Sequence, residues 1–362
     1  MILRHIFLFA WVLFFSVSVS AANVANLYKA SVQLPARLNE SDLLNQAFNQ
    51  AVDKVLFRVS GQKASIGSDV LASAHKSARG WVAQHRIQDL PDLVEFDGEL
   101  QTARQVNVSF YSESINRFLY ANGLAVWGSN RPSILLWLVQ EKDGVRTVSG
   151  ARQPSAELGQ MFAYGKELGL PTYAPLQDRV DAEALSAGAL WGFFEDEILQ
   201  ASERYQTDVV FAVRMGQYGN AVNVDGVLFA PGAVPQRLSV NAPSEAVANE
   251  MIVEQLAEAL SNRYASVRSA GSGQSLPVKV TGVNTYQALQ NVKQYLDKVG
   301  VVRESRIQLI EGDSVELLLE LDGSVDKFRN SVALNSMLSP KSLSALDPDA
   351  NRVEMFEYKG SN

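Results

Sequence analysis

The sequence contains no cysteine and only three histidines, which excludes several kinds of chemistry. Without cysteine there can be no disulfide, thiolate nucleophile, cysteine-type zinc site or lipid attached to a lipobox cysteine. Only His75 and His85 lie beyond the first 22 residues, too few for a multi-histidine metal centre. We therefore expect no metal and no cofactor, and we expect the fold to be stabilised by burial of apolar side chains.

Positive charge is also scarce, with 32 Lys and Arg against 39 Asp and Glu and a net charge of −7. Removal of Arg4 with the first 22 residues lowers the net charge to −8. Proteins that bind nucleic acid usually have a basic patch or stripe. The composition therefore argues against a nucleic-acid partner and favours a soluble protein.

Long apolar runs are missing after the N-terminal segment MILRHIFLFAWVLFFSVSVSAA. That segment has a basic start, an apolar run from Ile6 to Phe15 and small residues at its end, which is typical of a secretory signal peptide. We predict cleavage after Ala21 or Ala22, export to a periplasm and no stable membrane span afterwards. The alternative is an uncleaved anchor helix.

Residues 23–128 have the pattern of a ferredoxin-like domain with one added helix. Strands are expected at 28–34, 85–96, 103–110 and 124–128. Helices are expected at 40–60, 69–83 and 112–123, the first of them capped by Asn39 and ended by Gly61. The 97–98 Asp-Gly step predicts a hairpin turn.

Residues 129–268 predict a mixed α/β domain. The apolar run SILLWLVQ suggests a central strand covered on both faces. Helices are expected at 157–168, within 192–208 (a helix and its exit) and after Pro243, with strands at 170–176 and in a later meander. The Gly/Ser-rich segment 269–275 predicts a flexible linker. Residues 276–362 then have a second ferredoxin-like β-α-β-β-α-β order, with a helix over 324–338. The fold class is therefore α/β (α+β) in three small mixed domains.

Four motifs occur in order between residues 24 and 268: VLFRVSG, WGSNRPSILLWL, ELGLPTYAPLQD and LWGFFEDEILQASERYQTDVVFAVRMG. Together they resemble the family called domain of unknown function 2066, exported proteins of Gram-negative proteobacteria. The resemblance implies a periplasmic or envelope protein and supplies no activity and no catalytic residue. The middle domain is more loosely similar to the amino-terminal domain of TolB, a likeness of fold alone.

Trp127, Arg131 and Trp137 are the candidate binding or domain-junction residues. Arg131 stands between two tryptophans, before a proline that stiffens the chain. A guanidinium there could pair with a carboxylate and stack on Trp127, fixing the junction of the first two domains. The alternative is a site for an anion or a peptide carboxylate. Trp137 is expected to fill a core, with one acceptor for its indole N–H.

Acidic residues between 178 and 197 are the other candidates. Asp178, Asp181 and Glu183 follow a predicted strand, where ligands often bind in α/β folds, although surface solvation is the simpler explanation. Residues 195–197, Glu-Asp-Glu, could bind a divalent cation or could favour a helix N-terminus. Arg204 and Tyr205 are expected to be packing and cap residues. No catalytic motif is recognised, because Ser73 and Lys76 lack the partners of a Ser-x-x-Lys enzyme.

Two functions therefore remain. The first is a non-enzymatic periplasmic binding or scaffold protein of the envelope, whose partner is an envelope protein or a peptidoglycan-associated protein. The second is a hydrolase that acts on envelope material with the carboxylates near residues 178–197. An enzyme should have a deep pocket with converging polar groups and perturbed carboxylates, whereas a scaffold should offer open surfaces.

Overall fold

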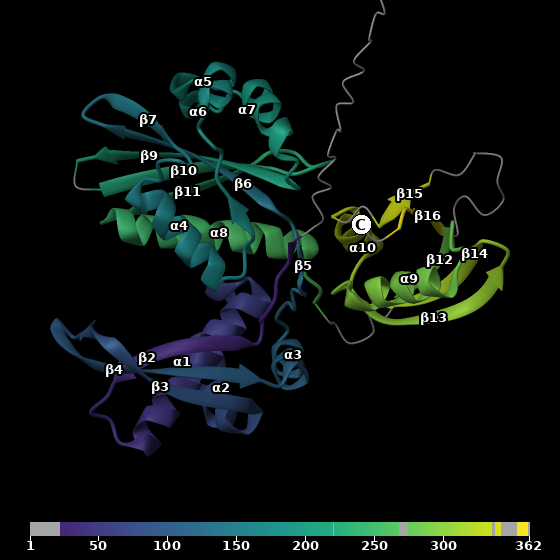
Figure 1. Ribbon diagram of the computed structural model, residues 1–362, viewed down its shortest axis with the longest axis horizontal. Helices are drawn as coiled ribbons and strands as arrows, with labels where there is room; N and C mark the ends of the chain where they lie inside the picture. The colour runs from purple at the N-terminus through teal and green to yellow at the C-terminus, as the bar shows by residue number, and fades with distance from the viewer. Residues whose placement is uncertain (1–21, 220, 268–273, 335–336, 342–352, 361–362) are drawn as a thin grey trace, which may run out of the picture.

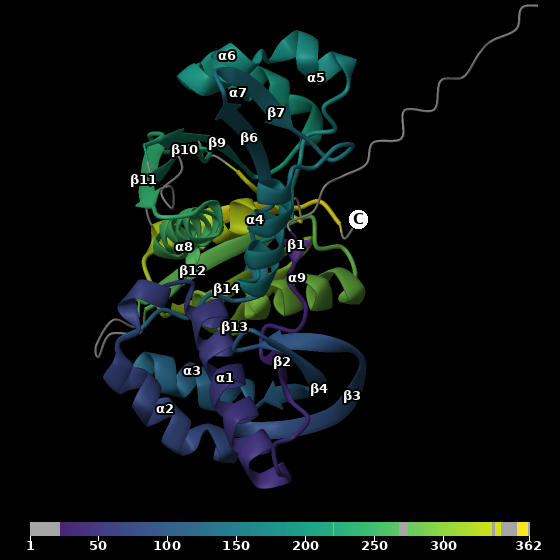
Figure 2. The same cartoon turned by 90° about the vertical axis from the view of Figure 1, so that its left-hand side faces the viewer.

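The structure is a computed structural model and describes residues 22–219, 221–267, 274–334, 337–341 and 353–360. The chain folds into three units, and each unit combines helices with its own principal sheet (Figure 1). Figure 2 shows the first unit at one end, with the second and third above it. The predicted class, a mixed α+β chain of several units, is confirmed.

The first unit is a three-stranded sheet covered on one face by helices. Its strands pair in the order β2-β4-β3, all antiparallel, so β2 lies at an edge. The Asn39 side chain accepts from the Asp42 amide at the start of α1, and Gly61 ends that helix at φ 65°, as predicted. The elements are β2 (Lys29–Pro35), α1 (Glu40–Ser60), α2 (Ser68–Trp81), β3 (Val82–Phe96), β4 (Glu99–Phe110) and α3 (Ser112–Ala121).

The strand expected at 124–128 does not join this sheet. Its alternation is real, but the two faces are buried in different cores. Leu124 and Val126 pack in the core of the first unit, whereas Ala125 and Trp127 pack in the core of the second. Within the described chain its only strand-like pairing is one isolated bridge, from Val126 to Ser266. The segment therefore connects two cores.

The second unit contains a sheet in the order β11-β10-β9-β6-β7, with β8 also pairing with β6. Helices α4 and α8 cover one face and α5 to α7 the other, so β6 is buried on both sides, as its apolar run predicted. Its elements are β5 (Asn130–Arg131), β6 (Ile134–Lys142), β7 (Val145–Ser149), α4 (Ala156–Glu167), β8 (Thr172–Tyr173), α5 (Arg179–Ala184), α6 (Ala187–Gly192), α7 (Glu195–Ser202), β9 (Val209–Tyr218), β10 (Ala221–Phe229), β11 (Gln236–Ala242) and α8 (Glu245–Tyr264). A short strand β1 (Ala22–Asn23) pairs with β5.

Local boundaries in this unit differ from the sequence expectation. The helix expected within 192–208, with its exit, is α7 followed by a 3-10 turn at Glu203–Tyr205, whereas Gly192 ends the preceding helix α6. The strand expected at 170–176 shrinks to β8. Helices α5 and α6 have only six residues each, too short for a helical apolar period to be recognised.

The third unit has a sheet in the order β13-β14-β12-β16-β15. The expected β-α-β-β-α-β order is present with one added strand, β15, which reverses the chain so that β16 runs parallel to β12. The helix expected over 324–338 ends at Ala333. The elements are β12 (Gln274–Thr281), α9 (Tyr286–Lys298), β13 (Val302–Glu311), β14 (Ser314–Leu321), α10 (Val325–Ala333), β15 (Leu338–Pro340) and β16 (Glu354–Tyr358).

Contacts away from the expected linker hold the third unit against the second. Of residues 269–275, the first five lie outside the described residues and the last two already belong to β12. The Lys327 ammonium donates to the Ala265 carbonyl at 2.6 Å, and the Asn130 amide donates to the Ser331 carbonyl at 3.0 Å. At Gly128 and Gly300 the two backbones approach so closely that a Cβ on Gly300 would lie 3.1 Å from the Gly128 nitrogen. The arrangement of these units is therefore set by packing.

Candidate functional site

Arg131 is completely buried where the first and second units meet. Its guanidinium donates five hydrogen bonds to main-chain carbonyls. Nε bonds to Gly128 (3.1 Å), Nη1 to Leu168 (2.8 Å) and Gly169 (3.1 Å), and Nη2 to Arg58 (2.7 Å) and Trp127 (3.1 Å). One side chain therefore ties together the end of α1, the residues before β5 and the turn after α4.

The prediction that Arg131 pairs with a carboxylate is wrong. Every hydrogen bond that its guanidinium makes to the described residues goes to a carbonyl, because main chain converges on it from several directions. Burial, and then the nearby charge of Arg58, lowers the pKa of Arg131 to about 9, so the group remains charged at neutral pH. The dipoles of these carbonyl groups stabilise the buried charge in place of a carboxylate.

Arg58 supports the same junction from α1. It donates to the carbonyls of Lys29 at 2.5 Å, Glu167 at 2.6 Å and Asn26 at 3.3 Å. Burial lowers its pKa, while the charge of Glu167 raises it. Arg58 lies inside the motif VLFRVSG, but no local pattern marks it as a junction residue.

The three residues proposed as a group separate in the structure. Arg131 lies over the Trp127 ring, with Cζ 4.2 Å from the ring centroid. Trp137 is buried on the opposite face of the second sheet, where its indole N–H donates to the Ser202 hydroxyl at 3.0 Å. Trp127 and Arg131 therefore belong to the junction, and Trp137 to a core.

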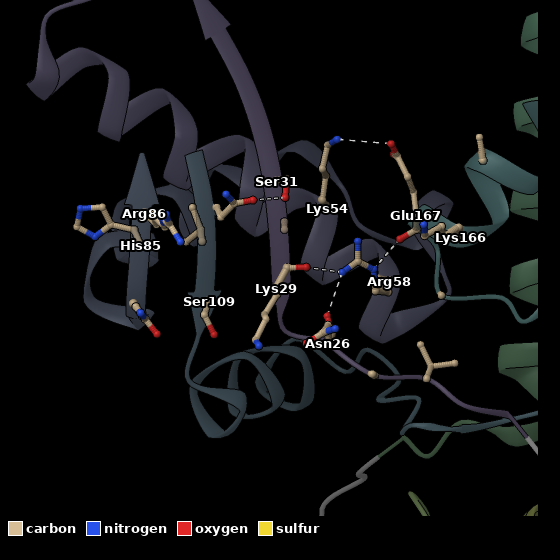
Figure 3. A pocket seen from close by; sticks show the side chains of 18 residues that line it. Asn26, Lys29, Ser31, Lys54, Arg58, His85, Arg86, Ser109, Lys166 and Glu167 are labelled. Carbon is tan, nitrogen blue, oxygen red and sulfur yellow. Dashed lines mark hydrogen bonds and ion pairs between the residues drawn. The ribbon is translucent and has the colours of Figure 1, made fainter. Parts of the chain in front are cut away.

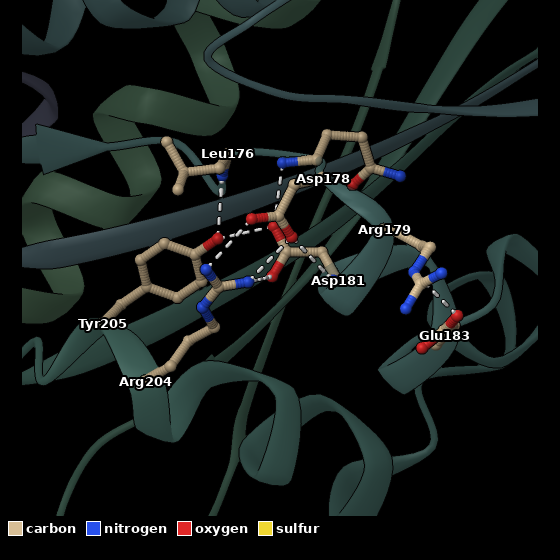
Figure 4. Close-up of polar contacts among 8 residues, drawn as sticks. Leu176, Asp178, Arg179, Asp181, Glu183, Arg204 and Tyr205 are labelled. Atoms are coloured by element: carbon tan, nitrogen blue, oxygen red, sulfur yellow. Dashed lines mark hydrogen bonds and ion pairs between the residues drawn. The ribbon is translucent and has the colours of Figure 1, made fainter.

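The acidic loop residues are held by internal partners (Figure 4). Arg204 binds both oxygens of Asp178, at 2.8 and 3.1 Å, and one oxygen of Asp181 at 2.9 Å. The hydroxyl of Tyr205 donates to the other oxygen of Asp181 at 2.5 Å. The hydrogen bond from Arg204 lowers the pKa of Asp178 to about 2. Arg204 and Tyr205 therefore anchor this loop, beyond the packing and cap roles expected of them.

The remaining acidic candidates are exposed. Glu183 forms a surface ion pair with Arg179 at 3.3 Å. Residues 195–197 lie in the first turn of α7 and all face solvent. Among the described residues, no group of three or more His, Asp or Glu side chains has a geometry that could hold a metal ion. The structure therefore does not assemble these carboxylates into one site.

A groove of about 840 Å³ lies between the first unit and α4 (Figure 3). It runs from the outer face of the first sheet, past edge strand β2, to the sides of α1 and α4. Lys29 and Ser31 come from β2, Arg86 from β3, and Lys54 and Arg58 from α1. Lys166 and Glu167 of α4 form the opposite wall.

Positive charge is concentrated in this groove. Its lining contains five Lys and Arg side chains against the single carboxylate of Glu167. That carboxylate lies 3.7 Å from the Lys54 ammonium. Lys29, Arg86 and Lys166 are exposed and form no ion pair with the described residues. In a chain of net charge −7, the groove can attract anions.

The groove was not predicted from the sequence because its cations lie far apart along the chain, from position 29 to position 166. No local cluster marks them. Pairing across the sheet brings Lys29 opposite Ser109 of β4, and Ser109 opposite Gln84 of β3, in one row. Arg86 lies one row further, opposite Asn107. Only this register places Lys29 and Arg86 on a common face.

A second pocket, of about 410 Å³, lies between α7 and the loop after β10. Of its carboxylates, Asp208 accepts bonds from both the amide and the hydroxyl of Ser133, each at 2.6 Å. Burial raises the pKa of Asp208, and the bonds to Ser133 oppose that rise. This carboxylate therefore fixes the start of β6. None of the helices described is long and apolar enough to cross a membrane.

Comparison with known families gives a match for one part of the chain. Residues 21–128 match the family described as domain of unknown function 8605. The expected membership of domain of unknown function 2066 is therefore wrong. Two of the motifs that suggested it contain Arg58 and Arg131, and these residues serve the junction of the units. No curated protein matches the chain. The matched stretch includes β2, β3, β4 and α1, so most of the groove lies within it.

Proposed function

We propose that this chain is an exported periplasmic binding or scaffold protein of the cell envelope, and that the groove between its first and second units is the binding surface. The supporting observation is the unmatched positive charge of the groove. Three exposed cations without ion-pair partners in the described chain are available to a ligand. Charges that serve only folding are normally paired or hydrogen-bonded within the protein, as Arg131 is.

The alternative, a hydrolase using the carboxylates near residues 178–197, has less support. General acid-base catalysis needs a carboxyl group that can exchange protons near the working pH. Asp178 is instead held ionised by Arg204, and its lowered pKa is the opposite of what a general acid requires. Asp181 is buried and bonded by Arg204 and Tyr205. Both are better suited to shaping the loop.

Export is proposed from the N-terminal segment, whose basic start, apolar run and small residues are those of a signal peptide. Intact mass spectrometry of the protein from a periplasmic fraction should give a chain beginning at residue 22 or 23. A mass that retains Met1 would contradict cleavage, and recovery only with the membrane fraction would favour the anchor.

Binding at the groove can be tested in intact cells. A photoreactive amino acid in place of Ser31 should form adducts on illumination, whereas the same group at the exposed Ser73 on α2 should not. Reversal of the groove charge with Lys29→Glu and Lys166→Glu should remove the Ser31 adducts. Equal labelling at both positions, or adducts that survive the charge reversal, would argue against the groove as the binding surface.

A further inference from the structure

Strand β2 leaves one hydrogen-bonding edge open beside the groove. It is the terminal strand of its sheet and pairs only with β4. In an antiparallel pair, alternate residues bond to the neighbouring strand and the others direct their N–H and C=O groups away from it. Whether the even- or the odd-numbered residues of β2 bond to β4 therefore decides which residues direct their N–H and C=O groups to the open edge.

The flanking hydrogen bonds fix that parity. The Phe110 amide donates to the Tyr28 carbonyl, and the Ala36 amide donates to the Thr102 carbonyl, so even-numbered residues bond to β4. The register between them has no bulge. Ser31 and Gln33 therefore direct their main-chain groups to the open edge.

Both residues are exposed. Outside the β2–β4 pairing, no described main-chain group forms a hydrogen bond with the N–H or C=O of Ser31 or Gln33. At the beginning of the edge, the Lys29 carbonyl accepts from Arg58.

Cations lie on both sides of this edge. Side chains of odd-numbered β2 residues stand on the outer face of the sheet, so Lys29 is on that face, and Arg86 joins it two strands away. Lys54 and Arg58 belong to α1, which packs against the opposite face through the core. An added strand would alternate its side chains between these faces. Acidic side chains of either parity would then meet positive charge.

We propose, resting on the binding function above, that the groove takes an extended acidic peptide segment of a partner protein, which adds to β2 as a further strand. Main-chain bonds at Ser31 and Gln33 would give affinity, and the surrounding cations would select acidic sequence. The apolar side chains in the lining are alanines and valines, which are small and offer an acyl chain or an aromatic anchor little apolar contact. This favours a peptide over a lipid.

The experiment measures binding of synthetic peptides to the purified chain by calorimetry. The probe is a peptide of about ten residues with glutamate at alternate positions, and the control has lysine in place of glutamate. Only the glutamate peptide should bind, and added salt should weaken its binding. A further version is N-methylated at every position. Strand addition needs amide donors of the peptide in either register, so this version should not bind.

Protein variants supply the second test. The variant Lys29→Glu with Lys166→Glu should bind the glutamate peptide about tenfold more weakly, or weaker still. Lys76→Glu with Arg79→Glu makes the same change of net charge on α2 of the first unit and should leave binding within about twofold. Hydrogen exchange should slow at the amides of Ser31 and Gln33 when the peptide is present. This exchange measurement uses the unaltered chain and does not depend on a variant folding.

The outcomes separate this inference from the proposed function. If the N-methylated peptide binds as well as the unmodified one, or Ser31 and Gln33 gain no protection, strand addition is wrong. If polyphosphate or vesicles of anionic phospholipid bind in place of the peptide, and Lys29→Glu with Lys166→Glu abolishes that binding, the groove is a binding surface and the peptide is wrong. If no probe binds and the Ser31 crosslinks are also absent, both proposals fail.

Discussion

Arg131 and the groove cations are positive charges in neighbouring parts of one molecule, and they differ in their partners. Arg131 is completely buried and makes five hydrogen bonds to carbonyls. Lys29, Arg86 and Lys166 are exposed and have no ion-pair partner among the described residues. The buried charge has used its donors to join chain segments, whereas the exposed charges keep theirs available. The number of internal partners therefore separates a cation that serves folding from cations that can serve recognition.

The largest expected effect is at the buried side of this comparison. Arg131→Ala should lower the free energy of unfolding by about 3–5 kcal/mol, because several buried carbonyls lose their donor together. Arg131→Lys should recover only part, since an ammonium cannot reproduce the planar fork. Denaturant unfolding measures both. A loss below about 1 kcal/mol for Arg131→Ala would mean that the junction tolerates unbonded carbonyls.

A smaller effect is expected next to Arg131. Gly169 has φ 71°, and a Cβ there would lie 2.9 Å from the Arg131 Nη1 atom. Gly169→Ala should therefore cost about 1–3 kcal/mol, through backbone strain and displacement of the guanidinium. Gly98→Ala is the matched control, because Gly98 also has positive φ, 81°, but nothing lies near its Cβ position. Equal losses of unfolding free energy in the two variants would show that only backbone strain matters.

The acidic loop extends the comparison to a cation paired with carboxylates. Arg204→Ala should raise the pKa of Asp178 from about 2 towards its ordinary value of 3.8. Because the pKa is lowered in the folded state, the stabilisation is complete above about pH 4 and is lost as the pH falls through 2. The difference in free energy of unfolding between wild type and Arg204→Ala should therefore become smaller as the pH falls from about 4 to 2.

Carboxyl NMR titration and unfolding between pH 2 and 5 would measure this. The control is Arg179→Ala, which removes only an exposed pair with Glu183. A pKa of Asp178 that does not change in Arg204→Ala would show that the lowering comes from main-chain hydrogen bonds.

The smallest effect on stability is expected in the groove. Lys29→Glu with Lys166→Glu should change the free energy of unfolding by less than about 1 kcal/mol, because exposed charges contribute little to folding. The same variant should lose ligand binding. A large loss of stability would place these residues with Arg131 as structural charges and would weaken the proposed binding role.

Local patterns in the sequence predicted much of the fold. The cap at Asn39 and the glycine that ends α1 were identified correctly, as was the strand β6 buried on both faces. These features depend on neighbours in sequence and on the period of apolar residues, so they can be read locally. The same reading failed for 124–128, where alternation is strand-like but serves two cores.

The sequence alone determined the kinds of residue available: no cysteine, few histidines, an acidic balance and helices and strands in nearly the observed order. Tertiary structure decided what the charges do. Arg131 met carbonyls in place of the expected carboxylate, and Asp178 and Asp181 met Arg204. Lys29 and Lys166 came to face one groove. The physical reason is that a charge acts on whatever lies within a few ångströms in space, and those neighbours come from segments 26 residues apart for Asp178 and Arg204, and more than a hundred apart for Lys29 and Lys166.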